Sequence, residues 1–343
     1  MKNITSPLST FILLAFLLVV LFFINLSIGS VTISLNDTFN AIFGQEVSHT
    51  SFEYIIWNYR IPKAVTAILA GSGLALCGLL MQTLFRNPLA GPFVLGISSG
   101  ASLGAALLIM GLSLFSGSIA FSLSDHLALA IASSLGSFLV LLVVMGVAVK
   151  VKDTMSLLII GLMFGSLTAA IVSILSFLAK AEQLQRYVFW TFGSLGDLSW
   201  NQIYILMVMV FVGILVSIRC IKSLNSYLIG ENYAKSMGVN LKKSRFTIIA
   251  ATGLLAGSIT AFAGPIAFIG LAVPHLTRQL FNTTDHKILL PAVLINGGII
   301  VLVCDMVAQL PGSVKVLPIN AITSLIGAPV VIWLLMRKKN IVF

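Results

Sequence analysis

The chain has 343 residues, of which 58% are hydrophobic and only 9% are charged, and its formal net charge at pH 7 is +10. About a quarter of the residues of a soluble domain are charged, so this composition excludes an ordinary soluble globular protein. The basic residues lie mainly at the ends of apolar segments, which favours a role in orienting membrane spans over nucleic-acid binding.

Ten apolar segments follow one another along the chain, and a transmembrane helix needs about 20 such residues. We therefore predict an all-α, polytopic membrane protein with ten transmembrane helices in a single domain, residues 1–343. The first segment lacks a small-x-small cleavage site and is expected to be a retained span, not a signal peptide. The expected spans are Thr10–Leu26, Ile61–Leu84, Phe93–Leu112, Leu127–Val149, Met155–Leu178, Ile203–Ile218, Phe246–Phe262, Ile266–Phe281, Ile288–Ala308 and Ile319–Met336.

The distribution of basic residues predicts the orientation of these spans. With both termini inside, 15 of the 20 Lys and Arg residues lie on the inner side, and the outer ones are Arg60, Lys63, Lys180, Arg186 and Lys315. Such an asymmetry is typical of cytoplasmic loops, so both termini of this multi-pass chain are expected in the cytoplasm. Spans two to five and seven to ten have the same order and opposite starting sides, which predicts an inverted repeat.

The longest polar interval runs from Arg219 to Arg245 and contains six basic residues and one acidic residue, Glu231. Gly230 and Gly238 divide it, which predicts two short helices at the membrane face. These helices are expected to present an apolar stripe to a partner outside the bilayer, and the alternative is a solvated loop that only carries positive charge. The stripe consists of Leu224, Leu228, Ala234 and Met237.

The chain lacks the sequence motifs of common enzymes: it has no P-loop, no HExxH and no GxSxG. Cys77, Cys220 and Cys304 are widely spaced and predict neither a metal site nor a disulfide. His275, alone in an apolar span, favours a packed histidine over a ligand. Asp305 lies near the outer end of the ninth span, where hydrogen bonding or a helix-end role is favoured over proton relay.

Several blocks of the chain, in order, carry a resemblance to a known family. They include Arg60-Ile61-Pro62-Lys63 and the segments 70–78, 81–92, 95–101, 264–275, 285–291 and 325–329. Over nearly the whole chain the sequence resembles the FecCD-type permease family of bacterial ABC importers for iron-siderophores, haem and cobalamin. The resemblance implies a type II ABC importer permease with ten helices per subunit and two permease subunits, identical or paralogous, around a central pathway.

The resemblance also implies partners and site residues. Two ABC ATPase subunits, which bind ATP and Mg, would engage the coupling loop, about 219–245, through Leu228, Gly230, Glu231, Ala234 and Gly238. A periplasmic or lipid-anchored substrate-binding protein would dock on the outer face at Arg60 and Lys63. Where the family has a third arginine this chain has Gln309, and Lys315 is the nearby candidate replacement. Thr154 and Met155 align with the cytoplasmic gate, at which Met155 departs from the more polar family residue.

These implications predict a transport subunit that is not itself an enzyme and binds no cofactor or metal. The expected cargo is an iron chelate, an iron-siderophore first, with haem and cobalamin as open alternatives. An ion-coupled secondary carrier is the competing hypothesis from another class, and ATP dependence of uptake into vesicles separates the two.

Overall fold

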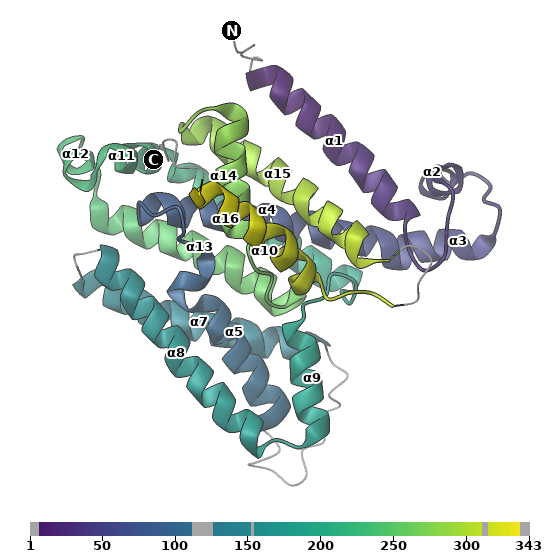
Figure 1. The fold of residues 1–343 in the computed structure, drawn as a ribbon, viewed down its shortest axis with the longest axis horizontal. Helices are drawn as coiled ribbons and strands as arrows, with labels where there is room; N and C mark the ends of the chain where they lie inside the picture. The colour runs from purple at the N-terminus through teal and green to yellow at the C-terminus, as the bar shows by residue number, and fades with distance from the viewer. Residues whose placement is uncertain (1–6, 112–125, 152–153, 311–314, 337–343) are drawn as a thin grey trace.

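The computed structural model describes residues 7–111, 126–151, 154–310 and 315–336, and these residues form helices and no strands (Figure 1). The helices, with η marking short 3-10 or π turns, are α1 (Pro7–Ser27), α2 (Leu35–Phe43), α3 (Thr50–Ile55), η1 (Ile56–Arg60), α4 (Ile61–Leu84), η2 (Pro92–Leu95), α5 (Ile97–Ala106), η3 (Leu107–Gly111), α7 (His126–Lys150), α8 (Thr154–Leu178), α9 (Ala181–Thr191), α10 (Trp200–Arg219), α11 (Ile221–Ile229), α12 (Glu231–Ser236), α13 (Leu241–Ala263), α14 (Ile269–Phe281), α15 (His286–Ala308) and α16 (Ile319–Met336).

Within these described ranges, seven helices are long and apolar enough to cross a membrane. Three shorter helices, α5, α14 and α16, occupy the positions of the other three expected spans, so the order of ten spans agrees with the prediction. Two boundaries differ by five residues or more. Residues 50–60 are helical and continue into α4, because a π-helical turn joins the two parts, where a loop was expected. The helix α13 begins at Leu241, five residues early, because the side chain of Asn240 caps it by accepting from the Lys243 N–H.

The helix α4 lies at the centre of the bundle and packs against α15, α13, α14 and α10. Its close contact with α15 depends on paired glycines, since a Cβ atom on Gly71 would lie 2.2 Å from the carbonyl oxygen of Gly297. A Cβ atom on Gly78 would likewise lie 1.7 Å from the carbonyl oxygen of Gly270 on α14. Because lipid provides no hydrophobic drive between helices, such backbone contact is a main source of packing energy in a membrane bundle.

The packing of the helices repeats in the two halves of the chain, in the same order along the sequence. The contact of α4 with α15 corresponds to that of α13 with α7 when spans two to five are exchanged with spans seven to ten. In the same way, α5 packs against α7 and α8 as α14 packs against α15 and α16. This correspondence agrees with the inverted repeat expected from the order of the spans, although the sequences of the two halves are only weakly similar.

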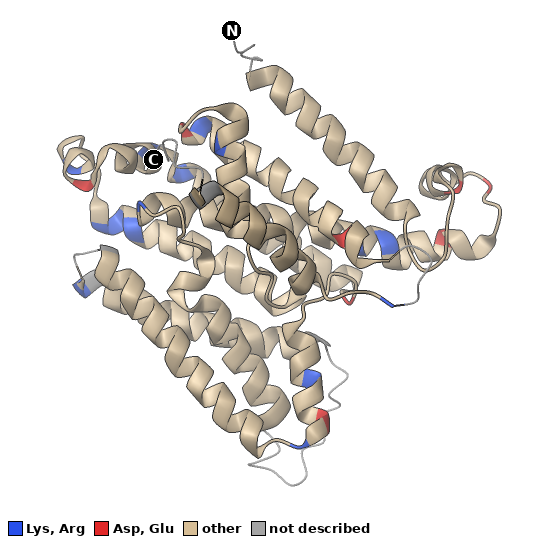
Figure 2. Ribbon diagram, in the orientation of Figure 1, with Lys and Arg blue, Asp and Glu red and all other residues tan. Residues whose placement is uncertain are grey.

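The two ends of the bundle differ in charge (Figure 2). One end, called the basic end below, contains α11, α12 and the first residues of α13 and α15, where lysine and arginine gather. The opposite end contains α2, α3 and α9. The helix α1 begins near the basic end, where the ring of Phe11 contacts the tilted ring of Phe281 on α14, and it ends near Arg60 at the opposite end.

Candidate functional site

The segment from Arg219 to Arg245 folds as the helix pair that its glycine pattern predicts. The helix α11 ends at Gly230, whose φ of 133° lies in a region that L side chains rarely adopt, and α12 follows directly. Gly238, with φ of 80°, then allows the turn into α13. Both glycines are therefore required by the backbone itself, and they limit α12 to six residues.

One side of this helix pair is buried against the bundle. Leu224, Tyr227 and Ala234 have no exposed surface, and the hydroxyl of Tyr227 donates to the carbonyl oxygen of Leu241 over 3.3 Å. Burial raises the pKa of the Tyr227 hydroxyl, so the group remains a neutral donor. The helix pair is thus fixed to the protein by its own apolar side chains.

The expected apolar stripe is therefore wrong in direction for two of its residues. Leu224 and Ala234 are fully buried and Leu228 is half-buried, because α11 packs against α4 and α15 and α12 packs against α13. The residues that face outward are Ile229, Tyr233 and Met237, which are 62%, 48% and 51% exposed. They follow one another at intervals of four, and we call them the exposed ridge.

Polar contacts connect α11 to the core helices. The side-chain oxygen of Asn225 accepts from the backbone N–H of His286 over 2.9 Å and lies 2.7 Å from its Nδ1, while its amide donates to Asp285 over 2.7 Å. The other ring nitrogen of His286 lies 2.8 Å from the hydroxyl of Thr83 at the end of α4. This contact joins the helix pair to both α15 and α4.

A second polar contact joins α12 to two other elements. Glu231 forms an ion pair with Arg245 at 3.2 Å, and Arg245 also donates to the carbonyl oxygen of Val151 over 3.2 Å. Arg245 is only 7% exposed although it lies near the start of α13. The contact is adjacent to the expected gate, since α8 begins at Thr154, whose side chain lies outside the described part of the structure, and Met155 is 56% exposed.

The predicted docking residues of the opposite end make contacts within the chain. Arg60 is buried, and its guanidinium donates to the carbonyl oxygens of Leu26 and Val31 at the end of α1. Lys63 forms an ion pair with Asp305 at 2.9 Å. Lys315 is exposed.

Asp305 is almost completely buried and accepts two further hydrogen bonds, both of 2.9 Å, from the amides of Asn25 and Gln309. Asp305 therefore acts as a hydrogen-bond acceptor, as expected. Gln309, the expected counterpart of an arginine in the resembled family, is part of this cluster, because its amide donates to Asp305.

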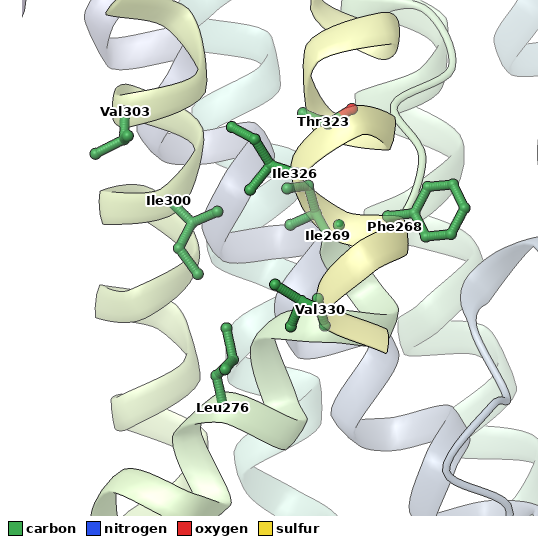
Figure 3. A pocket seen from close by; sticks show the side chains of 10 residues that line it. Phe268, Ile269, Leu276, Ile300, Val303, Thr323, Ile326 and Val330 are labelled. Carbon is green, nitrogen blue, oxygen red and sulfur yellow. The ribbon is translucent and has the colours of Figure 1, made fainter. Parts of the chain in front are cut away.

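One cavity lies within the helix bundle and another lies beside the helix pair. One of about 190 Å³ lies between α14, α15 and α16 and is lined by apolar side chains such as Phe268, Leu276 and Ile300, with Thr323 as a polar exception (Figure 3). The other, of about 560 Å³, lies beside the Glu231–Arg245 pair and reaches Met145 and Phe246. Among the described residues, no group of three or more His, Cys, Asp and Glu could hold a metal ion, and the three cysteines are free and buried.

Comparison with known proteins identifies the family. The sequence profile of the FecCD transport family matches residues 17–337. The chain belongs to this family. The match covers almost all of the chain, which is therefore a polytopic membrane permease of ABC importers.

Individual relatives and a solved structure support the assignment of this chain to the FecCD family. The chain is 34% identical over 288 residues to the vitamin B12 import system permease protein BtuC of Salmonella paratyphi A (strain ATCC 9150 / SARB42), covering 84% of this chain and 85% of the relative. It is 32% identical over 333 residues to the protein of the same name in Shigella boydii serotype 18, covering 97% and 94%. A solved structure described as an inward-facing conformation of a metal-chelate type ABC transporter superposes with a TM-score of 0.80 at 29% identity, covering 97% of this chain and all of that one.

Proposed function

We propose that this permease imports a metal chelate, an iron-siderophore in the first place, and that ATPase subunits bound at its basic end drive the transport. ATP and Mg would be bound by the ATPase and not by this chain. A second permease subunit, most simply a second copy, would complete the pathway. Membership of an importer permease family supports this architecture.

The observation that carries the proposal is the exposed ridge on the helix pair. Ile229, Tyr233 and Met237 are exposed apolar side chains on or directly beside the short helices α11 and α12, at the end of the bundle richest in lysine and arginine. Exposed apolar side chains on short helices can serve as the anchors of a helix-in-groove contact. Because the buried face of the pair is fixed to the bundle, force applied to the ridge reaches the spans by rigid-body motion.

The charge of the basic end supports an orientation of the chain in the membrane. The basic end is placed in the cytoplasm of the inner membrane, because cytoplasmic loops carry the excess of lysine and arginine. The helix α1 begins on that side, and α16 starts at the opposite end, where Asn320 contacts Phe192 and Thr191. Both termini would then be cytoplasmic, and a substrate-binding protein would approach the end with α2, α3 and α9.

The docking residues on that outer side, Arg60, Lys63 and Lys315, remain a prediction. Arg60 and Lys63 are engaged by carbonyl groups and by Asp305, so their release would leave buried polar groups without partners. We propose that Lys315, which is exposed, is the more accessible of the three for a carboxylate of the binding protein. Such surface pairs guide the rate and register of docking more than they add affinity.

A pair of single substitutions tests the role of the exposed ridge. Ile229→Asp and Tyr233→Asp should prevent co-purification of the ATPase and abolish ATP-driven uptake, because each places a charge in an apolar contact. Asn232→Asp is the matched control, since it adds the same charge at an exposed position of α12, next to Tyr233, without removing apolar surface. Normal assembly and uptake in both ridge variants would contradict the proposal, and so would uptake driven by an ion gradient without the ATPase.

The substrate requires a separate experiment. Vitamin B12 is the second candidate, favoured by the relatives whose names state vitamin B12 import. Proteoliposomes that contain the permease, its ATPase and its binding protein should accumulate a ferric siderophore and exclude cobalamin. Preferential accumulation of cobalamin would replace the first candidate with the second and leave the ATP-driven mechanism intact.

A further inference from the structure

The short helix α2 carries an apolar row along its exposed side. The row consists of Leu35, Phe39 and Phe43, which recur at intervals of four and are all exposed. The neighbouring row is polar, since Asn36 and Asn40 each follow a member of the apolar row by one residue. The remaining side of α2 is buried against the protein. The exposed surface of this helix is therefore itself divided into an apolar and a polar strip.

Two contacts fix the direction in which the apolar row faces. The ring of Phe39 stacks on that of Phe23 near the end of α1, with ring centres 4.4 Å apart. On the other side, the indole N–H of Trp57 in η1 donates to the carbonyl oxygen of Ala41 over 3.0 Å. Because α2 is held by both neighbours, its apolar row cannot turn inward.

The apolar row continues the lipid-facing side of α1. Phe16, Val19 and Phe23 follow one another along one face of that helix, and the first two are exposed. In a polytopic membrane permease, a long and apolar helix that is mostly exposed borders lipid. The stacking of Phe23 on Phe39 joins this surface to the apolar row without a gap.

The length of α1 indicates the depth of α2 in the bilayer. At about 1.5 Å per residue, the 21 residues of α1 extend about 30 Å, which is the thickness of the hydrocarbon core. Phe23 lies four residues before the end of α1, or about 6 Å along its axis. The helix α2, which lies beside that end (Figure 1), is therefore at the boundary between hydrocarbon and headgroups.

The chemistry of α2 and its neighbours also fits this boundary. The helix contains no lysine or arginine, and its one charged residue, Asp37, is buried and accepts from Ser34 and Ser48 over 2.8–3.0 Å. Beside it the indole N–H of Trp200 donates to the carbonyl oxygen of Trp57 over 3.1 Å, and tryptophan is enriched at membrane–water boundaries. Insertion of apolar side chains, and not attraction to anionic headgroups, would hold such a helix.

We propose that α2 is an interfacial anchor that inserts its apolar row into the lipid leaflet at the end of the bundle opposite the basic end. The row reaches about 5–10 Å into the boundary between headgroups and acyl chains, and Asn36 and Asn40 face water. Through Trp57 the anchor fixes the depth of the helical segment 50–60, and with it the start of α4. The inference depends neither on the cargo and the ATPase nor on which side of the membrane the basic end faces.

The test uses the full-length permease in phosphatidylcholine vesicles, with one introduced cysteine that carries a fluorophore. The three native cysteines are buried, so the label reports on the introduced position. Phe43→Cys and Leu35→Cys place the label in the apolar row, and Asn36→Cys is the matched control in the polar row of the same helix. Lipids with a nitroxide on the acyl chain quench the fluorescence from the hydrocarbon, and iodide quenches it from water.

The two rows should respond in opposite ways. In Phe43→Cys and Leu35→Cys we expect a nitroxide near the headgroup to quench more strongly than one near the methyl end, and iodide to quench weakly. In Asn36→Cys we expect strong quenching by iodide and weak quenching by both lipids. Added phosphatidylglycerol or higher salt should leave these values unchanged, because α2 exposes no charge. Leu35→Cys remains informative if Phe43→Cys does not fold.

Equal quenching at the three positions would overturn the inference, because the apolar row would then have no preference for lipid. It would also be overturned if the nitroxides left the label in Phe43→Cys unquenched and the substrate-binding protein shielded that label from iodide. The apolar row would in that case be a docking surface for a protein.

Discussion

Replacement of Lys63 by Met tests whether this residue serves the fold or the docking of a partner. The substitution removes the cation that lies 2.9 Å from Asp305 and leaves a carboxylate with a side chain only 2% exposed. Removing one member of a buried ion pair costs about 3–5 kcal/mol. Asn25 and Gln309 continue to donate to Asp305, so we expect a loss near the lower limit, about 3 kcal/mol.

The assay follows unfolding with a thiol-reactive dye, because Cys77, Cys220 and Cys304 are buried in the folded protein. Lys63→Met should lower the unfolding free energy, and addition of Asp305→Asn should restore most of it, because an amide without a charged partner is far less costly to bury. If Lys63→Met unfolds like the native chain but loses affinity for the binding protein, the reasoning is refuted and Lys63 is a docking residue.

Three other substitutions test the packing, the pH dependence and the turn between the short helices. Gly71→Ala should destabilise by about 1–3 kcal/mol, measured with the same dye, because its Cβ would meet the carbonyl of Gly297, while Gly146→Ala, with nothing within 4 Å, should not destabilise. The N–H of Lys287 and the amide of Asn225 lower the pKa of Asp285 below its ordinary value of 3.8. The carboxylate of Asp285 therefore stabilises the folded state fully at pH values above 3.8, and this stabilisation is lost as the pH falls through the lower pKa of the folded state. In Asp285→Asn, the free energy of unfolding should accordingly fall less steeply as the pH is lowered in this acid range. Gly230→Ala should strain the backbone at φ of 133° by about 1–3 kcal/mol and reduce ATP-driven uptake in vesicles, although unchanged uptake would show that the turn tolerates a side chain.

The order of the spans could be predicted from the sequence because length and hydropathy alone determine which segments can cross a bilayer. The helix break at Gly230 was equally readable, since few other residues adopt its backbone conformation. Short spans such as α14 were harder, because Phe268 and Gly264 have positive φ and the chain before Ile269 is not helical. The spacing of apolar residues along the sequence does not indicate such a short non-helical segment.

The contacts of the charged residues could not be predicted in this way. Lys63 and Asp305 are separated by more than two hundred residues, and nothing near either residue indicates the other. The direction of the apolar stripe was missed for a related reason. The side of α11 that is buried depends on where α4 and α15 lie, and Asn225, which contacts both Asp285 and His286, was not recognised at all.

The contacts of α4 with α15 indicate which part of the permease stays rigid during transport. At the opposite end Lys63 pairs with Asp305, in the middle Gly71 meets Gly297, and at the basic end Thr83 contacts His286. Helices joined at three levels resist sliding and rotation, so they move as one body. The helix α8, by contrast, is mostly exposed along its length. Movement that opens a pathway should therefore occur between α8 and the α4–α15 pair, and a cross-link between α4 and α15 should leave ATP-driven uptake intact.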